Sequence, residues 1–123
     1  TITLDGVEDI GHNKTDYWAS FSLLEINEIY LCMMSIKVLG IDSVKKQTSY
    51  KLKHDVEKII DAMGEGHIYI SNGSLIIALI LMGKSITLMS GNRNIKTKTK
   101  FKNMEILEAF SKSYKIAKMW GKI

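Results

Sequence analysis

An alternating run over residues 95–102 constrains the fold more than any other stretch of this 123-residue chain. Its sequence, IKTKTKFK, places lysine at every second position and Ile, Thr or Phe between the lysines. Successive side chains of a β-strand point to opposite faces of its sheet. The run therefore predicts a strand with one face packed on a core and one face made of lysines roughly 6.6 Å apart. Residues 85–89 predict a partner strand, joined to the run as a hairpin by the turn sequence SGNRN.

Residues 75–82 are the most apolar segment, and two structures fit them. Asn72 and Gly73 stand between two apolar runs, which is typical of a hairpin and would make the segment a buried strand. Its Leu, Ala and Met content instead favours a helix, which Ser71 or Asn72 would cap and Gly83 would end. Because apolar residues lie on all sides, we expect a buried, central helix. A short strand over residues 67–71 would lead into it.

The N-terminal part predicts two short strands and then a helix. Residues 2–7 and 16–21 alternate apolar and polar side chains, so we expect a hairpin of two strands joined by a polar loop. Ser22 and Glu25 have the spacing of a capping box and would start the first helix. Gly40 would end it.

Two more helices are expected downstream. One covers much of residues 43–63 and ends at Gly64, and the other begins at Asn103 and ends at Gly121. Apolar residues recur at helical spacing in each predicted helix, and we expect these stripes to face the core. The stripes are Ile26, Ile29, Tyr30, Met33 and Ile36 in the first helix, Leu52, Val56, Ile59, Ile60 and Met63 in the second, and Ile106, Leu107, Phe110, Tyr114 and Ala117 in the last.

Together these elements predict the α+β class. The chain length fits a single domain over residues 1–123, and the sequence holds no proline and no linker-like tract. We expect a small antiparallel sheet packed against about four helices, the buried central helix among them.

The charge is distributed unevenly along the chain. Residues 1–83 hold seven lysines and eleven acidic residues, whereas residues 84–123 hold nine lysines and one arginine against two glutamates. Such an asymmetry indicates an anionic partner for the C-terminal third. The alternative is that the two parts neutralise each other in the fold.

The lysine run itself has two explanations. A row of lysines protects an exposed edge strand from pairing with another chain, or it contacts phosphates or an acidic protein surface. A second set of lysines recurs at three- and four-residue spacing in the last helix, and this favours binding. The candidate partner-binding residues are Arg93 in the turn, Lys96, Lys98, Lys100 and Lys102 in the run, and Lys112, Lys115, Lys118, Lys122 and Trp120 in the last helix.

Signals for an enzyme, a cofactor or a metal are poor. Nucleotide-binding and nucleophile-elbow motifs are absent, as are sequence-specific nucleic-acid-binding signatures. The single cysteine, Cys32, lies in an apolar helical pattern typical of a buried thiol, and the three histidines lack metal-ligand spacing. We therefore expect no catalytic residue, no cofactor and no metal. One group of polar residues would form a small enzymatic site if its members converged: His67, Tyr69, Ser71 and Asn72.

No signal sequence is visible, and the longest apolar run is far shorter than the ~20 residues that span a bilayer. We therefore expect a cytoplasmic protein without a membrane partner. The sequence does not fix the oligomeric state.

Residues 69–83, YISNGSLIIALILMG, resemble a segment of small phage and prophage accessory proteins. This resemblance implies a helix over the apolar part, a mobile-element origin and the host cytoplasm as location. Such accessory proteins include anti-CRISPR inhibitors of host defence. We expect a non-enzymatic binding protein that presents a basic face to nucleic acid or a nucleoprotein. The alternatives are a defence inhibitor acting by protein–protein contact and a small enzyme using residues 67–72.

Overall fold

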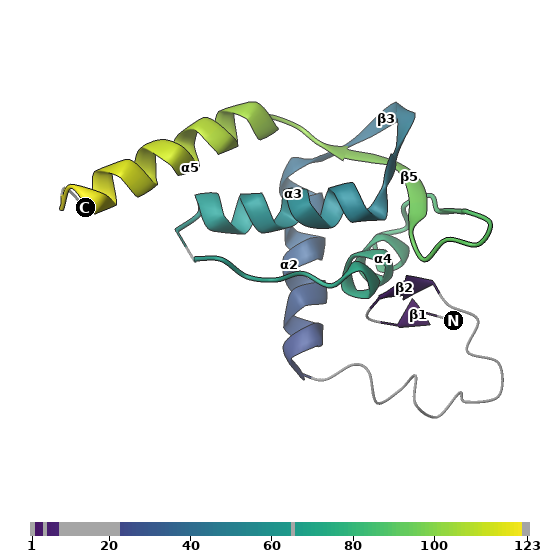
Figure 1. Ribbon diagram of the computed structural model, residues 1–123. Helices are drawn as coiled ribbons and strands as arrows, with labels where there is room; N and C mark the ends of the chain where they lie inside the picture. Colours follow the sequence, from purple (N-terminus) through teal and green to yellow (C-terminus); the bar gives the residue numbers. More distant parts are fainter. Residues whose placement is uncertain (1, 4, 8–22, 65, 122–123) are drawn as a thin grey trace.

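The computed structural model describes residues 2–3, 5–7, 23–64 and 66–121 and confirms the α+β class (Figure 1). Helices pack around one three-stranded antiparallel sheet, and a separate two-stranded hairpin lies at the N-terminal end. The elements are β1 (Ile2–Thr3), β2 (Gly6–Val7), α2 (Leu23–Leu39), β3 (Gly40–Thr48), α3 (Ser49–Ala62), α4 (Asn72–Leu81), β4 (Thr87–Leu88), β5 (Ile95–Phe101) and α5 (Met104–Met119).

The three-stranded sheet has the order β3-β5-β4. The predicted hairpin is confirmed, because β5 pairs with β4, although β4 is only two residues long. On its other side β5 pairs with β3, from Gly40 opposite Phe101 to Thr48 opposite Lys96. β5 is therefore the middle strand of the sheet.

The sequence did not predict β3. Residues 43–48 were assigned to a helix, and this is wrong: α3 begins only at Ser49, where the hydroxyl of Thr48 caps it by accepting a hydrogen bond of 3.2 Å from the N–H of Lys51. Helix propensity is a weak preference, and the tertiary environment overrides it. Here β5 pairs with residues 40–42 and 47–48, and this pairing on both sides of residues 43–46 keeps that segment out of the helix.

The predicted central helix is confirmed as α4. Its N-terminus is capped by Ser71, whose hydroxyl accepts a hydrogen bond of 3.1 Å from the N–H of Ser74. The first part of α4 is buried against α2 and α3. Burial on all sides was expected, but Ile80 and Leu81 at the C-terminal end are exposed. The core around α4 consists of Cys32, Ile36, Leu52, Val56, Ile59, Ile60, Ile70, Leu75, Ile76, Ala78, Leu79, Ile95 and Phe101.

The apolar stripe predicted for α3 faces the core except for Met63, which follows the helix and is exposed. In α2 the prediction holds less well, because Ile26 and Tyr30 are exposed while Cys32 is fully buried. Of the remaining α2 positions, Ile36 is buried, and two others pack against the core while partly buried: Ile29 and Met33.

The last helix contacts the core only near its start. Leu107 packs against the core as predicted, whereas Ile106 is exposed and Ala117 is half-buried. The side chains of Phe110 and Tyr114 lie outside the described residues. α5 packs beside α3 and then runs away from the sheet (Figure 1), so its second half has little core to face.

Asn103 precedes α5 at the predicted position but does not act as a side-chain cap. Its backbone is left-handed, with a φ of 63°, and its side chain makes no capping hydrogen bond. Glu105 lies in the first turn of α5, as expected.

The N-terminal residues form a hairpin of β1 and β2 in place of the single strand predicted over residues 2–7. Gly6 makes this possible, because its φ is +125° and a Cβ there would collide with the carbonyl oxygen of Arg93. The N–H of Val7 donates a hydrogen bond of 2.7 Å to that same oxygen. The predicted strand over residues 16–21, the loop before it and the capping residue Ser22 lie outside the described residues.

The short strand predicted over residues 67–71 is not present. Two of its N–H groups find carboxylates instead of a neighbouring strand. The N–H of Ile70 donates to Glu57 at 2.9 Å, and the N–H of Ser71 donates to Glu28 at 2.8 Å.

No loop separates α2 from β3, because the helix ends at Leu39 and the strand begins at Gly40. A side chain at Gly40 would collide with the carbonyl oxygen of Ile36 in the last turn of the helix. Within the described ranges, no helix combines the length and apolar character that crossing a bilayer requires.

Candidate functional site

The predicted alternation of β5 is confirmed. Ile95, Thr97, Thr99 and Phe101 are buried on one side, and the lysines between them are exposed on the other. Lys102, just after the strand, is also exposed, and its N–H donates a hydrogen bond of 3.0 Å to the carbonyl of Leu39. Burial of the intervening residues thus fixes Lys96, Lys98, Lys100 and Lys102 on the solvent side.

β5 is the middle strand, but β4 pairs with only two of its residues, so edge protection is excluded for Lys96 and stays an alternative for Lys98 and Lys100. β3 covers one side along the strand, and β4 covers the other side opposite Ile95 and Lys96. Beyond β4, the hydroxyl of Ser85 accepts a weak hydrogen bond of 3.4 Å from the N–H of Lys98.

β3 adds lysines to this surface that the sequence analysis missed. Asp42 pairs with Thr99 and Gln47 with Thr97, so five steps along β3 match two steps along β5. The residues between them bulge from the ladder, and they include the fully exposed Val44 and the exposed Lys45 and Lys46. A signal was available, since Ile41, Val44 and Thr48 are β-branched, as is typical of strands.

Lys46 spans the sheet from one outer strand to the other. Its Nζ donates a hydrogen bond of 3.1 Å to Oγ1 of Thr87 on β4, although β5 lies between β3 and β4. Thr87 pairs with Lys96, so both point to the same face. We call this surface the lysine face; its members are Lys46, Lys96, Lys98, Lys100 and Lys102.

Acidic residues lie near the lysine face but outside it, since Asp42 pairs with Thr99 and therefore points to the opposite face of the sheet. Oδ1 of Asp42 lies 3.9 Å from Nζ of Lys84, and Asp42 is largely exposed, so this ion pair contributes little. Glu105 lies beyond Lys102, in the first turn of α5.

The structure does not bring the remaining candidate residues onto the lysine face. Lys112, Lys118 and Trp120 are exposed on α5, and Figure 1 shows this helix running away from the sheet that carries the lysine face. The side chain of Lys115 and the whole of Lys122 lie outside the described residues.

Arg93 lies in the turn at the opposite end of β5 from α5 (Figure 1). Its side chain is 3.6 Å from the carboxylate of Asp5, and its carbonyl oxygen accepts hydrogen bonds from Val7 and, at 3.5 Å, from Asn72. These contacts give Arg93 a role in holding the N-terminal hairpin.

Three of the four residues suggested for an enzymatic site line one cavity of about 540 Å³: His67, Tyr69 and Ser71. Its other lining residues are Asp5, Glu25, Glu28 and Ile68.

Two polar side chains that line this cavity, Ser71 and Glu28, hold the backbone. The Ser71 hydroxyl caps α4 and donates a hydrogen bond of 2.7 Å to Ser74, and Glu28 accepts from the N–H of Ser71. Asn72 does not line the cavity; its amide donates hydrogen bonds of 2.9 Å to Asp5 and to Asn94. These contacts favour a structural role for the junction.

Buried charges next to the cavity also have structural partners. Lys53 is buried on α3, with its Nζ 4.6 Å from the ring centroid of Tyr69 and 5.4 Å from that of Tyr50. Tyr69 is largely exposed, but partial desolvation raises the pKa of its hydroxyl, and the negative charge of Glu57 raises it further. A hydroxyl with a raised pKa ionises less readily, which argues against a nucleophilic Tyr69.

Cys32 is fully buried in α2. Burial raises the pKa of its thiol strongly, and the carboxylates of Glu28 and Glu57 add to that effect. The thiol therefore stays protonated and unreactive near neutral pH. Across the described part of the chain, no group of three or more His, Cys, Asp or Glu side chains is arranged to hold a metal ion.

Comparison of the chain with protein-family models, with curated proteins and with solved structures gave no match.

Proposed function

We propose that the protein is a non-enzymatic nucleic-acid-binding protein that presents its lysine face to the phosphate backbone. The observation that carries this proposal is the sorting of β5, in which every lysine is exposed and every residue between the lysines is buried. Like charges that stand roughly 6.6 Å apart on one face repel each other and add nothing to folding. A polyanionic partner would relieve this repulsion.

The chemistry of the face favours phosphates over base edges. Lysine ammonium groups are mobile point charges that neutralise phosphates and release condensed counterions. Phosphate contacts position a protein on nucleic acid but carry no sequence information. We therefore expect weak sequence preference and, if all five lysines of the face contact phosphates, a salt slope of about −4.5 on B-DNA.

The test is fluorescence anisotropy with labelled random-sequence DNA and RNA at low and moderate salt. The double variant Lys98→Gln/Lys100→Gln removes two charges from the lysine face. Lys37→Gln/Lys58→Gln removes two charges from exposed positions on α2 and α3 and serves as the matched control.

We expect the wild type to bind at low salt and to lose affinity steeply as salt rises. The lysine-face variant should bind less tightly and should reduce the salt slope by about 2, whereas the control should stay close to wild type. Absence of binding at low salt would rule out the proposed function. Equal losses in the two variants would show that net charge alone is responsible and that the lysine face is not the site.

A further inference from the structure

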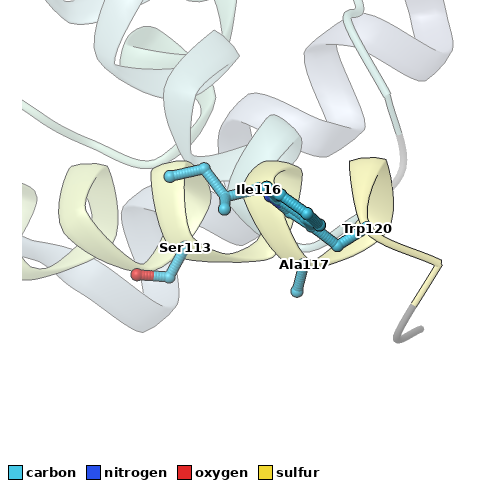
Figure 2. Close-up of a pocket in the computed structure, with 4 residues that line it drawn as sticks. All are labelled: Ser113, Ile116, Ala117 and Trp120. Atoms are coloured by element: carbon cyan, nitrogen blue, oxygen red, sulfur yellow. The ribbon is translucent and has the colours of Figure 1, made fainter.

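The outward side of α5 carries an apolar stripe that no other described element covers. Met104 and Leu107 pack against the core, and each residue of a helix turns about 100° from the one before. Ser113, Ile116 and Trp120 therefore lie on the side away from the core. Figure 2 shows Trp120 beside Ile116, and these residues line a shallow, open hollow of about 540 Å³ together with Ala117.

The stripe has the spacing of a helix-pairing seam. Ile106, Ala109, Ser113, Ile116 and Trp120 follow one another at steps of three, four, three and four residues, which is the seam of a coiled coil. All five are exposed, with 68% of Ile106, 56% of Ile116 and 74% of Trp120 accessible. Connected apolar surface of this kind marks an interaction site. We refer to these five residues as the α5 stripe.

We propose that the α5 stripe is the contact between two copies of this chain, paired through antiparallel α5 helices. Charge complementarity sets the orientation. α5 has an acidic first turn, with Glu105, and a basic last turn, with Lys118. Antiparallel pairing brings the acidic end of each helix alongside the basic end of the other, and the helix dipoles also oppose each other. Parallel pairing would bring the two basic ends together.

The sizes of the side chains set the register. After Ile106 the stripe has two small residues, Ala109 and Ser113, and then two large ones, Ile116 and Trp120. In an antiparallel seam each layer joins one position from each helix. One register places Trp120 over Ala109 of the second copy and Ile116 over Ser113 of the second copy, so each of the four layers that these residues form combines a large residue with a small one, and Ile106 lies outside these layers. Such pairing fills the interface without voids. A two-fold axis then crosses the seam between Ser113 and Ile116.

The contact is small and therefore weak. One helical seam buries less than the ~800 Å² per partner of a standard stable interface. We accordingly expect a dimer that forms and dissociates with concentration.

The test is sedimentation velocity of the full chain over about a hundredfold range of concentration, because a reversible dimer shifts its sedimentation coefficient by mass action. The wild type should move from monomer to dimer. Trp120→Ala and Ala109→Trp should each weaken the dimer at least about tenfold, since each leaves a layer with two small or two large residues. Both positions are exposed in the monomer, so circular dichroism should show an unchanged fold.

The decisive variant is the swap Ala109→Trp/Trp120→Ala. It restores one large and one small residue to the layer, so the swap should dimerise more tightly than either single variant. A swap no better than the single variants, or a wild type that stays monomeric throughout, would overturn the proposal. The proposal would also be overturned if the wild type stayed monomeric and Trp120→Ala weakened its binding to oligonucleotides. Trp120 would then belong to a nucleic-acid-binding surface. These outcomes are independent of the lysine-face variants.

Discussion

The carboxylate of Glu57 accepts a hydrogen bond of 2.9 Å from the backbone N–H of Ile70, thirteen positions further along the chain. The other oxygen of Glu57 lies 2.8 Å from Nδ1 of His54. Glu57 is buried, and so is the N–H that it satisfies. One side chain of α3 thus holds the segment over residues 67–71 that leads into α4. It supplies an acceptor that a neighbouring strand would otherwise have to supply.

Replacing Glu57 should destabilise the protein through the N–H of Ile70. Glu57→Ala leaves that buried group without an acceptor, which costs about 1–3 kcal/mol of unfolding free energy. Glu57→Gln keeps one oxygen acceptor and should cost less. Urea unfolding measures both, with Lys58→Ala on the exposed side of α3 as the control. A Glu57→Ala variant within about 0.5 kcal/mol of wild type would show that the N–H finds another partner.

The two ends of α4 should respond differently to the same substitution. Leu79 is fully buried and Leu81 is 61% exposed. Leu79→Ala removes core contacts and leaves a cavity, and it should lower the unfolding free energy by about 2–5 kcal/mol. Leu81→Ala should change it by about 0.5 kcal/mol or less. Chemical unfolding of the two variants tests how deeply each end of α4 is buried. Equal losses of unfolding free energy would contradict the buried position of Leu79 and the exposed position of Leu81.

Cys32 should make the protein less stable in alkali. Burial raises the thiol pKa in the folded state, whereas the thiol of the unfolded chain has a pKa of about 8.5. Above that pH the unfolded chain binds fewer protons than the folded chain, so the unfolding free energy falls as pH rises, by up to about 1.4 kcal/mol per pH unit. Below it, this contribution is fully present.

The comparison with Cys32→Ala isolates this effect. The difference in unfolding free energy between wild type and variant should be constant up to about pH 8 and should then decrease towards pH 10. As an independent check, a thiol reagent should label the native protein only as fast as it opens. Rapid labelling of the folded chain at neutral pH would contradict the buried position of Cys32.

The elements that the sequence predicted best are those with a local signal. The alternation of β5, the Ser71 cap of α4 and the glycine after α3 each depend on a few adjacent residues. β3 has no strict alternation, and its structure depends on a strand that comes much later in the chain. The same reason explains the candidate site: the three lysines of β5 and the adjacent Lys102 were predicted, whereas Lys46 belongs to the surface only because β3 exists.

Buried charges were the other part that the sequence could not predict. Lys53 and Glu57 lie beside the apolar stripe of α3, where charged residues are normally exposed. Tyr50 is part of α3, but the ring of Tyr69 and the N–H of Ile70 come from the segment after α3, which meets the helix only in the folded chain. Such partners leave no trace in the spacing of α3 itself.

The direct junction of α2 with β3 affects the thermodynamics of binding. Because Gly40 joins the helix to the strand without a loop, β3 cannot change direction unless the last turn of α2 also changes. The part of β3 that follows this junction and pairs with β5, Gly40 to Asp42, therefore has a course that is fixed before any partner arrives. Ordering a flexible segment on binding reduces affinity, and a preorganised surface avoids that entropy loss. Whatever binds the sheet should meet a backbone that is already in place, so we expect only the lysine side chains to lose freedom.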